Sequence, residues 1–136
     1  MKKIITCMIV LSVLMSSVAF ANTVGFGFNL KPSDMNNDFE RGAYGFKNDN
    51  EARFYVTQEY TTYPMSSSTP IYYRPYHNRY YSIDEIANYI VMTSNARKYA
   101  SYKVDVKADD EFYLACRVKY SALDSEEYLA TGKWTP

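Results

Sequence analysis

The stretch FYLACRVKY, residues 112–120, decides the fold because its side chains alternate in character along its whole length. The apolar set is Phe112, Leu114, Cys116, Val118 and Tyr120. The residues that alternate with this apolar set include Tyr113, Arg117 and Lys119. Successive side chains of a β-strand point to opposite faces, so this period of two predicts a strand with one buried face. Cys116 lies on that face and is expected to be a small hydrophobic core residue.

Similar alternation marks other parts of the chain. Residues 24–30, 52–60, 100–106 and 128–134 alternate in the same way, and residues 71–76 read as a further strand. The 15 tyrosines add to this signal, because aromatic residues favour half-buried pleated surfaces. About six strands with turn-rich connections predict a mostly β chain that folds as an antiparallel β-sandwich.

A polar turn, residues 107–110, separates two of the alternating stretches. A short turn of this kind between two strands is typical of a β-hairpin. We therefore expect residues 100–106 and 112–120 to pair with each other.

One segment departs from the period of two. Ser82 and Glu85 have the spacing of a capping box, and Ile86 and Ile90 follow at helical spacing. The sequence therefore predicts one short helix over residues 83 to about 91.

The first 21 residues have the parts of a secretory signal peptide. Lys2 and Lys3 precede an apolar run, and Ala19 and Ala21 form a small-x-small cleavage site. Residues 1–21 are therefore expected to be a signal peptide, and residues 22–136 a single β-sandwich domain. The apolar run is too short to span a bilayer and no second run follows. We expect a secreted, extracellular protein with no membrane span.

The charge balance limits the partners. Once Lys2 and Lys3 are removed, the 15 Asp and Glu outnumber the remaining basic side chains. Binders of nucleic acids and of anionic membranes need clustered Lys and Arg, and the sequence shows no such cluster. Nucleic acid is therefore not expected as a partner.

Signatures of catalysis and metal binding are missing from the sequence. His77 is the only imidazole, which excludes a multi-histidine zinc site and leaves no spacing typical of a catalytic triad. The acidic turns lack the spacing of a calcium loop. We expect no enzyme activity, no cofactor and no metal, although a secreted hydrolase with a carboxylate pair hidden in the sequence stays a third hypothesis.

A tyrosine-rich stretch, IYYRPYHNRYY at residues 71–81, is the candidate binding site. Aromatic rings stack on sugars or pack against protein partners, and arginines form paired hydrogen bonds with carboxylates. Alternation places Tyr72, Arg74 and Tyr76 on one face, which we expect to be exposed. The alternative is that half of the rings face the core and the others merely cover the sheet. The predicted binding residues are Tyr72, Arg74, Tyr76, His77 and Tyr80.

Three short motifs carry a resemblance to a known family. They are NTVGFGFNLKP at residues 22–32, ARKY at residues 96–99 and GKW at residues 132–134. The chain resembles a family of small secreted β-sandwich proteins of unknown function from Gram-positive bacteria. That family is distantly similar to lactococcin-like bacteriocins, exported toxins that act on cell-wall synthesis in related bacteria.

These features together predict a secreted, non-enzymatic binding protein that recognises an extracellular or cell-envelope partner. The alternative is a bacteriocin-like secreted toxin that acts on the cell envelope of related bacteria. The two hypotheses differ in outcome, because a toxin inhibits the growth of those bacteria and a plain binding protein does not.

Overall fold

The computed structural model describes residues 22–30, 40–77, 86–118 and 127–136. The expected signal peptide, residues 1–21, and the predicted site residue Tyr80 lie outside these residues. The described part of the chain is mostly β, as predicted. Its eight strands are β1 (Val24–Leu30), β2 (Glu40–Phe46), β3 (Arg53–Thr61), β4 (Ile71–Tyr76), β5 (Ile90–Met92), β6 (Arg97–Ser101), β7 (Glu111–Val118) and β8 (Tyr128–Thr135).

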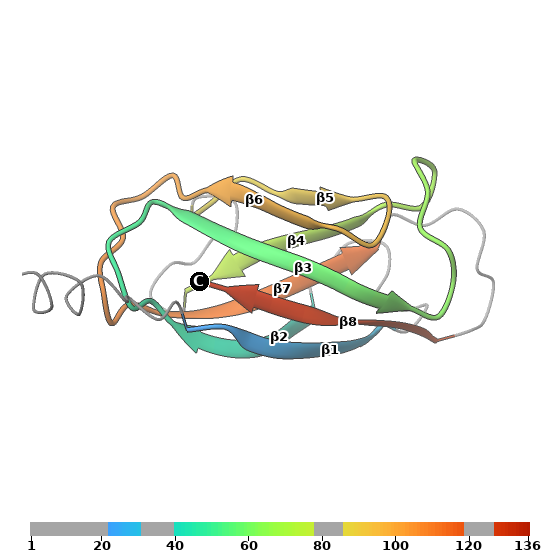
Figure 1. Ribbon diagram of the computed structural model, residues 1–136, viewed down its shortest axis with the longest axis horizontal. Helices are drawn as coiled ribbons and strands as arrows, with labels where there is room; N and C mark the ends of the chain where they lie inside the picture. The colour runs from blue at the N-terminus through green and yellow to red at the C-terminus, as the bar shows by residue number, and fades with distance from the viewer. Residues whose placement is uncertain (1–21, 31–39, 78–85, 119–126) are drawn as a thin grey trace, which may run out of the picture.

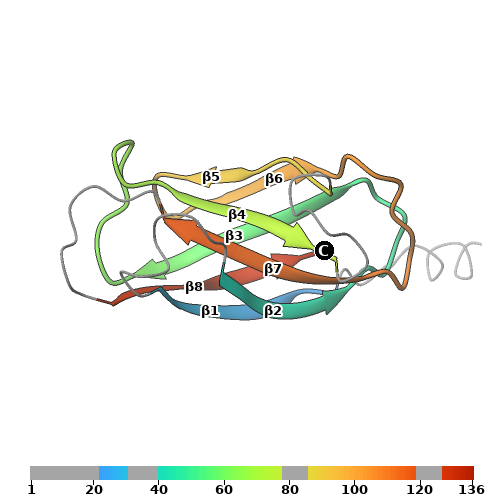
Figure 2. The same cartoon turned by 180° about the vertical axis from the view of Figure 1, so that it is seen from behind.

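The strands form two antiparallel sheets of four strands each. The front sheet, which faces the viewer in Figure 1, has the order β1-β8-β3-β6. The back sheet, seen from the other side in Figure 2, has the order β2-β7-β4-β5. Both views place β1 beside β2 along one long edge of the sandwich and β5 beside β6 along the other.

The core lies between the two sheets and uses the inward residue of each alternating pair. In β1, Phe26, Phe28 and Leu30 are buried, and the residues between them are exposed. β8 contributes Trp134, and β7 contributes Cys116, which is fully buried as predicted. The alternation in the sequence therefore locates the core faces of β1, β7 and β8 correctly.

The predicted helix is wrong. Ile90–Met92 form strand β5, and Ala87 makes an isolated bridge with Tyr102. Ile86 and Ile90 are buried, so their spacing reflects an extended segment that covers the core. The remaining part of the expected helix, residues 83–85, lies outside the described residues, which contain no helix. Six strands is also too few, because no strand was expected at β2 and β5 falls within the expected helix.

The predicted hairpin is wrong as well. β6 pairs with β3 in the front sheet, whereas β7 pairs with β2 and β4 in the back sheet. The turn itself is present, since the Asp110 amide donates to the Lys107 carbonyl at 3.2 Å and Asp109 has a φ of 69°. The alternation before this turn reflects burial during a crossing between the sheets, because Tyr102 and Val106 enter the core.

A buried glutamine organises a bulge in β3. The register between β3 and β8 shifts between Gln58 and Tyr60. Gln58 Nε2 donates to the carbonyls of Tyr60 and Thr131 at 2.6 and 2.8 Å, and its Oε1 accepts from the Tyr73 hydroxyl of the back sheet. The shift turns Tyr60 into solvent, whereas the alternation alone places it on the buried face.

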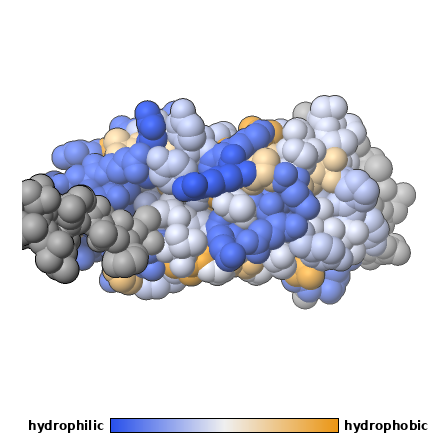
Figure 3. All heavy atoms as spheres, in the orientation of Figure 1, coloured by the Kyte–Doolittle hydropathy of each residue, from blue (hydrophilic) through white to orange (hydrophobic). Residues whose placement is uncertain are grey.

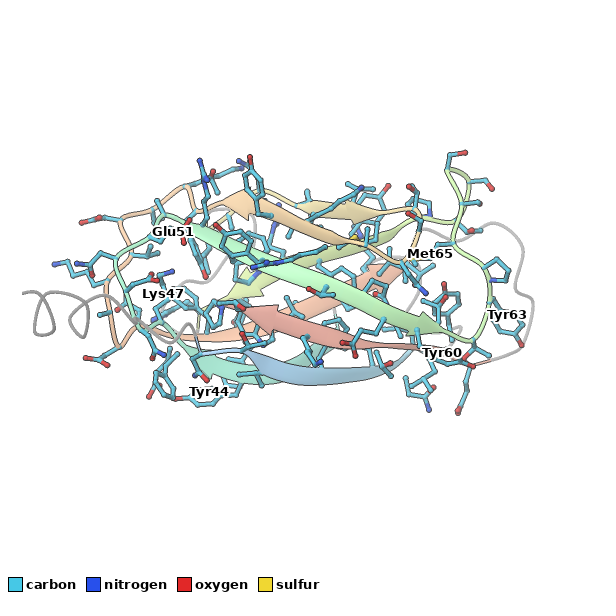
Figure 4. The ribbon with its side chains drawn as sticks, viewed as in Figure 1. Tyr44, Lys47, Glu51, Tyr60, Tyr63 and Met65 are labelled. Atoms are coloured by element: carbon cyan, nitrogen blue, oxygen red, sulfur yellow. The ribbon has the colours of Figure 1, made fainter. Side chains whose placement is uncertain are left out.

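A buried lysine ties together one end of the sandwich (Figure 4). The Lys47 amide donates to the Asp110 carbonyl at 3.0 Å, and Lys47 Nζ donates to the Pro136 main-chain oxygen at 3.1 Å. Nζ also pairs with Asp49 at 3.4 Å. Lys47 therefore holds the β2–β3 loop, the crossing segment and the residues after β8 in one arrangement.

Tyr102 gives a first stability prediction. Its ring packs on Phe54 and Phe112, and its buried hydroxyl has no hydrogen-bond partner among the described residues. We expect Tyr102→Phe to leave the free energy of unfolding unchanged or to raise it by about 1 kcal/mol, because the ring stays and an unsatisfied hydroxyl is removed. Urea denaturation measures the change. A loss of more than about 1 kcal/mol would show that the hydroxyl makes a favourable contact.

Candidate binding face

Strand β4 carries the core of the predicted site. Ile71 and Tyr73 point into the core, where the Tyr73 ring lies 5.3 Å from that of Phe26. Tyr72, Arg74 and Tyr76 therefore share the outer face of the back sheet. The face assignment made from the alternation is confirmed.

The expected exposure of Arg74 and Tyr76 is wrong. Their exposed fractions are only 2% and 8%, whereas Tyr72 is partly exposed. β4 is an inner strand that pairs with β7 along its whole length and with β5 only over Ile71–Tyr73. The Arg74 guanidinium lies 3.6 Å from the centre of the Tyr89 ring. Arg74 and Tyr76 thus form the floor of the face, and Tyr72 is the member that a partner can reach.

His77 does not lie with these residues. Its ring meets Phe112 edge-on at 5.4 Å, at the end of the sandwich. There it lines a pocket of about 290 Å³ with Asp105, Lys107 and Asp110. The Asp110 carboxylate accepts the Lys107 amide at 2.8 Å and so closes the turn. The described residues that line this pocket include no Ser, Thr or Cys nucleophile, and no group of three metal-ligating side chains occurs in the described part of the chain.

Two residues that the sequence reading missed complete the cluster around Tyr72. The Tyr89 ring meets Tyr72 edge-on at 5.9 Å, and the Arg117 guanidinium lies 5.2 Å from the centre of the Tyr72 ring. Tyr89 fell within the expected helix. Arg117 was placed on the outer face of its strand, but only the register, in which it is opposite Tyr72, connects the two.

A second aromatic group lies at the β2 edge of the same sheet. Tyr44 and Phe46 are 43% and 42% exposed, and the Tyr44 ring lies 5.3 Å from that of Tyr113. A hydrogen bond with Glu111 raises the pKa of Tyr44. We call the whole surface the aromatic face. Its members are Tyr44, Phe46, Tyr72, Tyr89, Val91, Tyr113 and Arg117.

Comparison of the chain with family models, with curated proteins and with solved structures finds no match. The resemblance to a secreted family from Gram-positive bacteria therefore stays a prediction from the three short motifs. In the described residues, no helix has the length and apolar character needed to cross a membrane.

Proposed function

We propose that this chain is a secreted, non-enzymatic binding protein that recognises an extracellular or cell-envelope partner through the aromatic face. The observation that carries the proposal is the gathering of aromatic side chains on the outside of one sheet. Tyr44, Phe46 and Val91 are each more than a third exposed on this face, at 43%, 42% and 38%. The core lies on the other side of the sheet and does not require them.

The chemistry of the face suits recognition. Tyrosine presents a large, rigid ring together with a hydroxyl, and tyrosine and arginine are enriched among the residues that contribute most to binding. Arg117 lies over Tyr72 at 5.2 Å and within 5.7 Å of the Tyr89 ring centre. These contacts restrict the side chains before a partner arrives, which lowers the entropy lost on binding.

The proposal is tested with a Tyr44→Ala/Tyr72→Ala variant, which removes one ring from each half of the face. Binding of the purified protein to isolated cell walls and to whole cells of Gram-positive bacteria is measured against the unmodified chain. We expect the variant to bind about tenfold more weakly or worse, because exposed aromatic anchors at the centre of an interface contribute most of its affinity.

Tyr60→Ala is the matched control. Tyr60 is 53% exposed, and it lies far from Tyr44 along the long axis of the molecule (Figure 4). The control is expected to bind normally. Unchanged binding by a folded Tyr44→Ala/Tyr72→Ala variant, or no binding by the unmodified chain, would count against the proposal. Growth inhibition of related bacteria by the unmodified chain would favour the toxin alternative.

A further inference from the structure

The outer face of the front sheet carries a stack of arginine and tyrosine side chains, which we call the cationic ladder. Tyr55 of β3 and Tyr99 of β6 are directly opposite in the register, with ring centres 5.8 Å apart. The Arg53 guanidinium lies 4.8 Å from the centre of the Tyr99 ring, and that of Arg97 lies 4.9 Å from the Tyr55 ring. Along the strand direction the order is therefore Arg53, then the paired Tyr99 and Tyr55, then Arg97.

The ladder is exposed, and its two charges are not neutralised by carboxylates. Arg53 and Arg97 are both exposed, and Tyr99 is 57% exposed. Among the described residues, neither arginine forms a salt bridge. Glu59 pairs with Lys133 at 3.0 Å, and Glu51 accepts a hydrogen bond from the hydroxyl of the ladder residue Tyr55 at 2.6 Å.

A guanidinium that lies on a ring keeps its N–H groups available at the edge of its plane. These N–H groups form a rigid fork that matches a carboxylate or a phosphate, and the ring contact reduces the side-chain entropy that binding would remove. Arg97 is opposite Thr57, four residues along β3 from Arg53. The two arginines are thus separated by roughly 13 Å along the strand, with the tyrosine pair between them.

Around the ladder this sheet face is polar, and the exposed Leu129 and Tyr60 lie toward the other end of β8 and β3. Thr57, Thr131 and Lys133 lie on the two central strands, and Gly25 and Gly27 leave the outer side of β1 without side chains. Figure 3 shows strongly hydrophilic side chains across the middle of this face. The front face therefore differs in chemistry from the aromatic face on the back sheet.

We propose that the cationic ladder binds an acidic polysaccharide. In such a polymer, anionic groups are separated by uncharged sugar rings. The ladder has the matching arrangement, because its two guanidinium groups lie on either side of an exposed tyrosine. Sugar rings stack on aromatic side chains, and the anions accept paired hydrogen bonds from the arginines. A nucleic acid, with one phosphate on every nucleotide, needs a denser cluster of cations. A protein partner is favoured by an apolar centre, which this hydrophilic face does not offer.

The charge balance of the sequence gave no sign of this site because its cations come from different strands. Arg53 belongs to β3 and Arg97 to β6, and only the pairing of these strands brings them onto one surface. The proposal is independent of the binding role assigned to the aromatic face, since the two sites lie on opposite sides of the sandwich.

The test uses hyaluronate, which carries a carboxylate on every second sugar, together with phosphomannan as a phosphate polymer and dextran as a neutral one. We expect the unmodified chain to bind at least one acidic polymer and not dextran, with binding that weakens as salt is added. Arg53→Gln/Arg97→Gln should lose about tenfold or more in affinity. The matched control, Lys103→Gln/Lys107→Gln, removes the same charge from the β6–β7 connection and should bind normally.

A measurement on the unmodified chain covers the case in which the arginine variant does not fold. Bound polysaccharide should protect Arg53 and Arg97, but not Arg117, from modification by phenylglyoxal, as read by mass spectrometry. The proposal is overturned if neither acidic polymer binds, if the control loses as much affinity as the ladder variant, or if protection does not occur. Tighter binding to polyglutamate or to oligothymidylate would also overturn it, in favour of a protein or a nucleic acid.

Discussion

Replacing Gly132 with alanine is expected to destabilise the domain by about 3 to 5 kcal/mol, or to prevent folding, because no space exists for the added methyl group. A Cβ atom on Gly132 would lie 2.1 Å from the Thr57 carbonyl oxygen and 2.8 Å from the Phe26 ring. The first neighbour is backbone of the adjacent strand, so relief requires a shift of β3 away from β8. Chemical denaturation of the soluble variant, or its yield of folded protein, measures the effect.

Gly27→Ala is the matched control for this prediction. It makes the same substitution on the neighbouring strand, where the nearest atom is the Thr131 methyl group at 3.9 Å, an ordinary contact distance. We expect Gly27→Ala to be neutral or to stabilise the domain by about 0.5 kcal/mol, because alanine lowers the entropy of the unfolded chain. Equal stability of the two variants would contradict the steric argument.

Replacing Gln58 with leucine is expected to lower the free energy of unfolding by about 3 to 5 kcal/mol, although the two side chains are similar in size. Gln58 is 2% exposed. Its side-chain amide donates to the carbonyls of Tyr60 and Thr131 and accepts a hydrogen bond from the Tyr73 hydroxyl. Leucine would leave these three groups without that partner inside the protein. An unsatisfied buried polar group costs about 1 to 3 kcal/mol.

A double-mutant cycle separates the contributions. Tyr73→Phe removes the hydroxyl that donates to Gln58, so it should partly rescue Gln58→Leu by about 1 kcal/mol. Urea denaturation of the four proteins gives the coupling energy. Strictly additive losses would show that the hydrogen bond between the two sheets contributes nothing to stability.

The parts of the fold that follow from local pattern were predictable. β1 and β8 appear in the sequence as clean alternations, because each has one face against the core and one outside. β2 was not predictable from the sequence, because Gly42 and Gly45 interrupt the alternation and the register of β2 with β7 shifts between Arg41 and Tyr44. Strand pairing could not be predicted from the sequence either. A polar turn between two alternating stretches has the same residue pattern whether the chain reverses within one sheet or crosses to the other sheet.

The candidate site shows the same division. Alternation gave the correct face for Tyr72, Arg74 and Tyr76, but it carries no information on which neighbours cover that face. The Arg74 guanidinium is covered by the ring of Tyr89, which directly precedes β5, and Tyr44 reaches the aromatic face from the opposite edge of the sheet. Such contacts depend on long-range pairing, which a single sequence read locally does not contain.

The strand order has a consequence for how the molecule assembles. Only β4 and β5 are both consecutive in the chain and paired, and every other pairing joins strands that are distant in sequence. β8, the last strand, is inserted between β1 and β3. The front sheet cannot be completed until β8 has been synthesised, so β1 and β3 lack the strand that lies between them until then. Bringing distant strands together costs loop-closure entropy before their contacts stabilise the chain, so we expect folding to be slow. The strands that are still unpaired make the incompletely folded chain prone to aggregation.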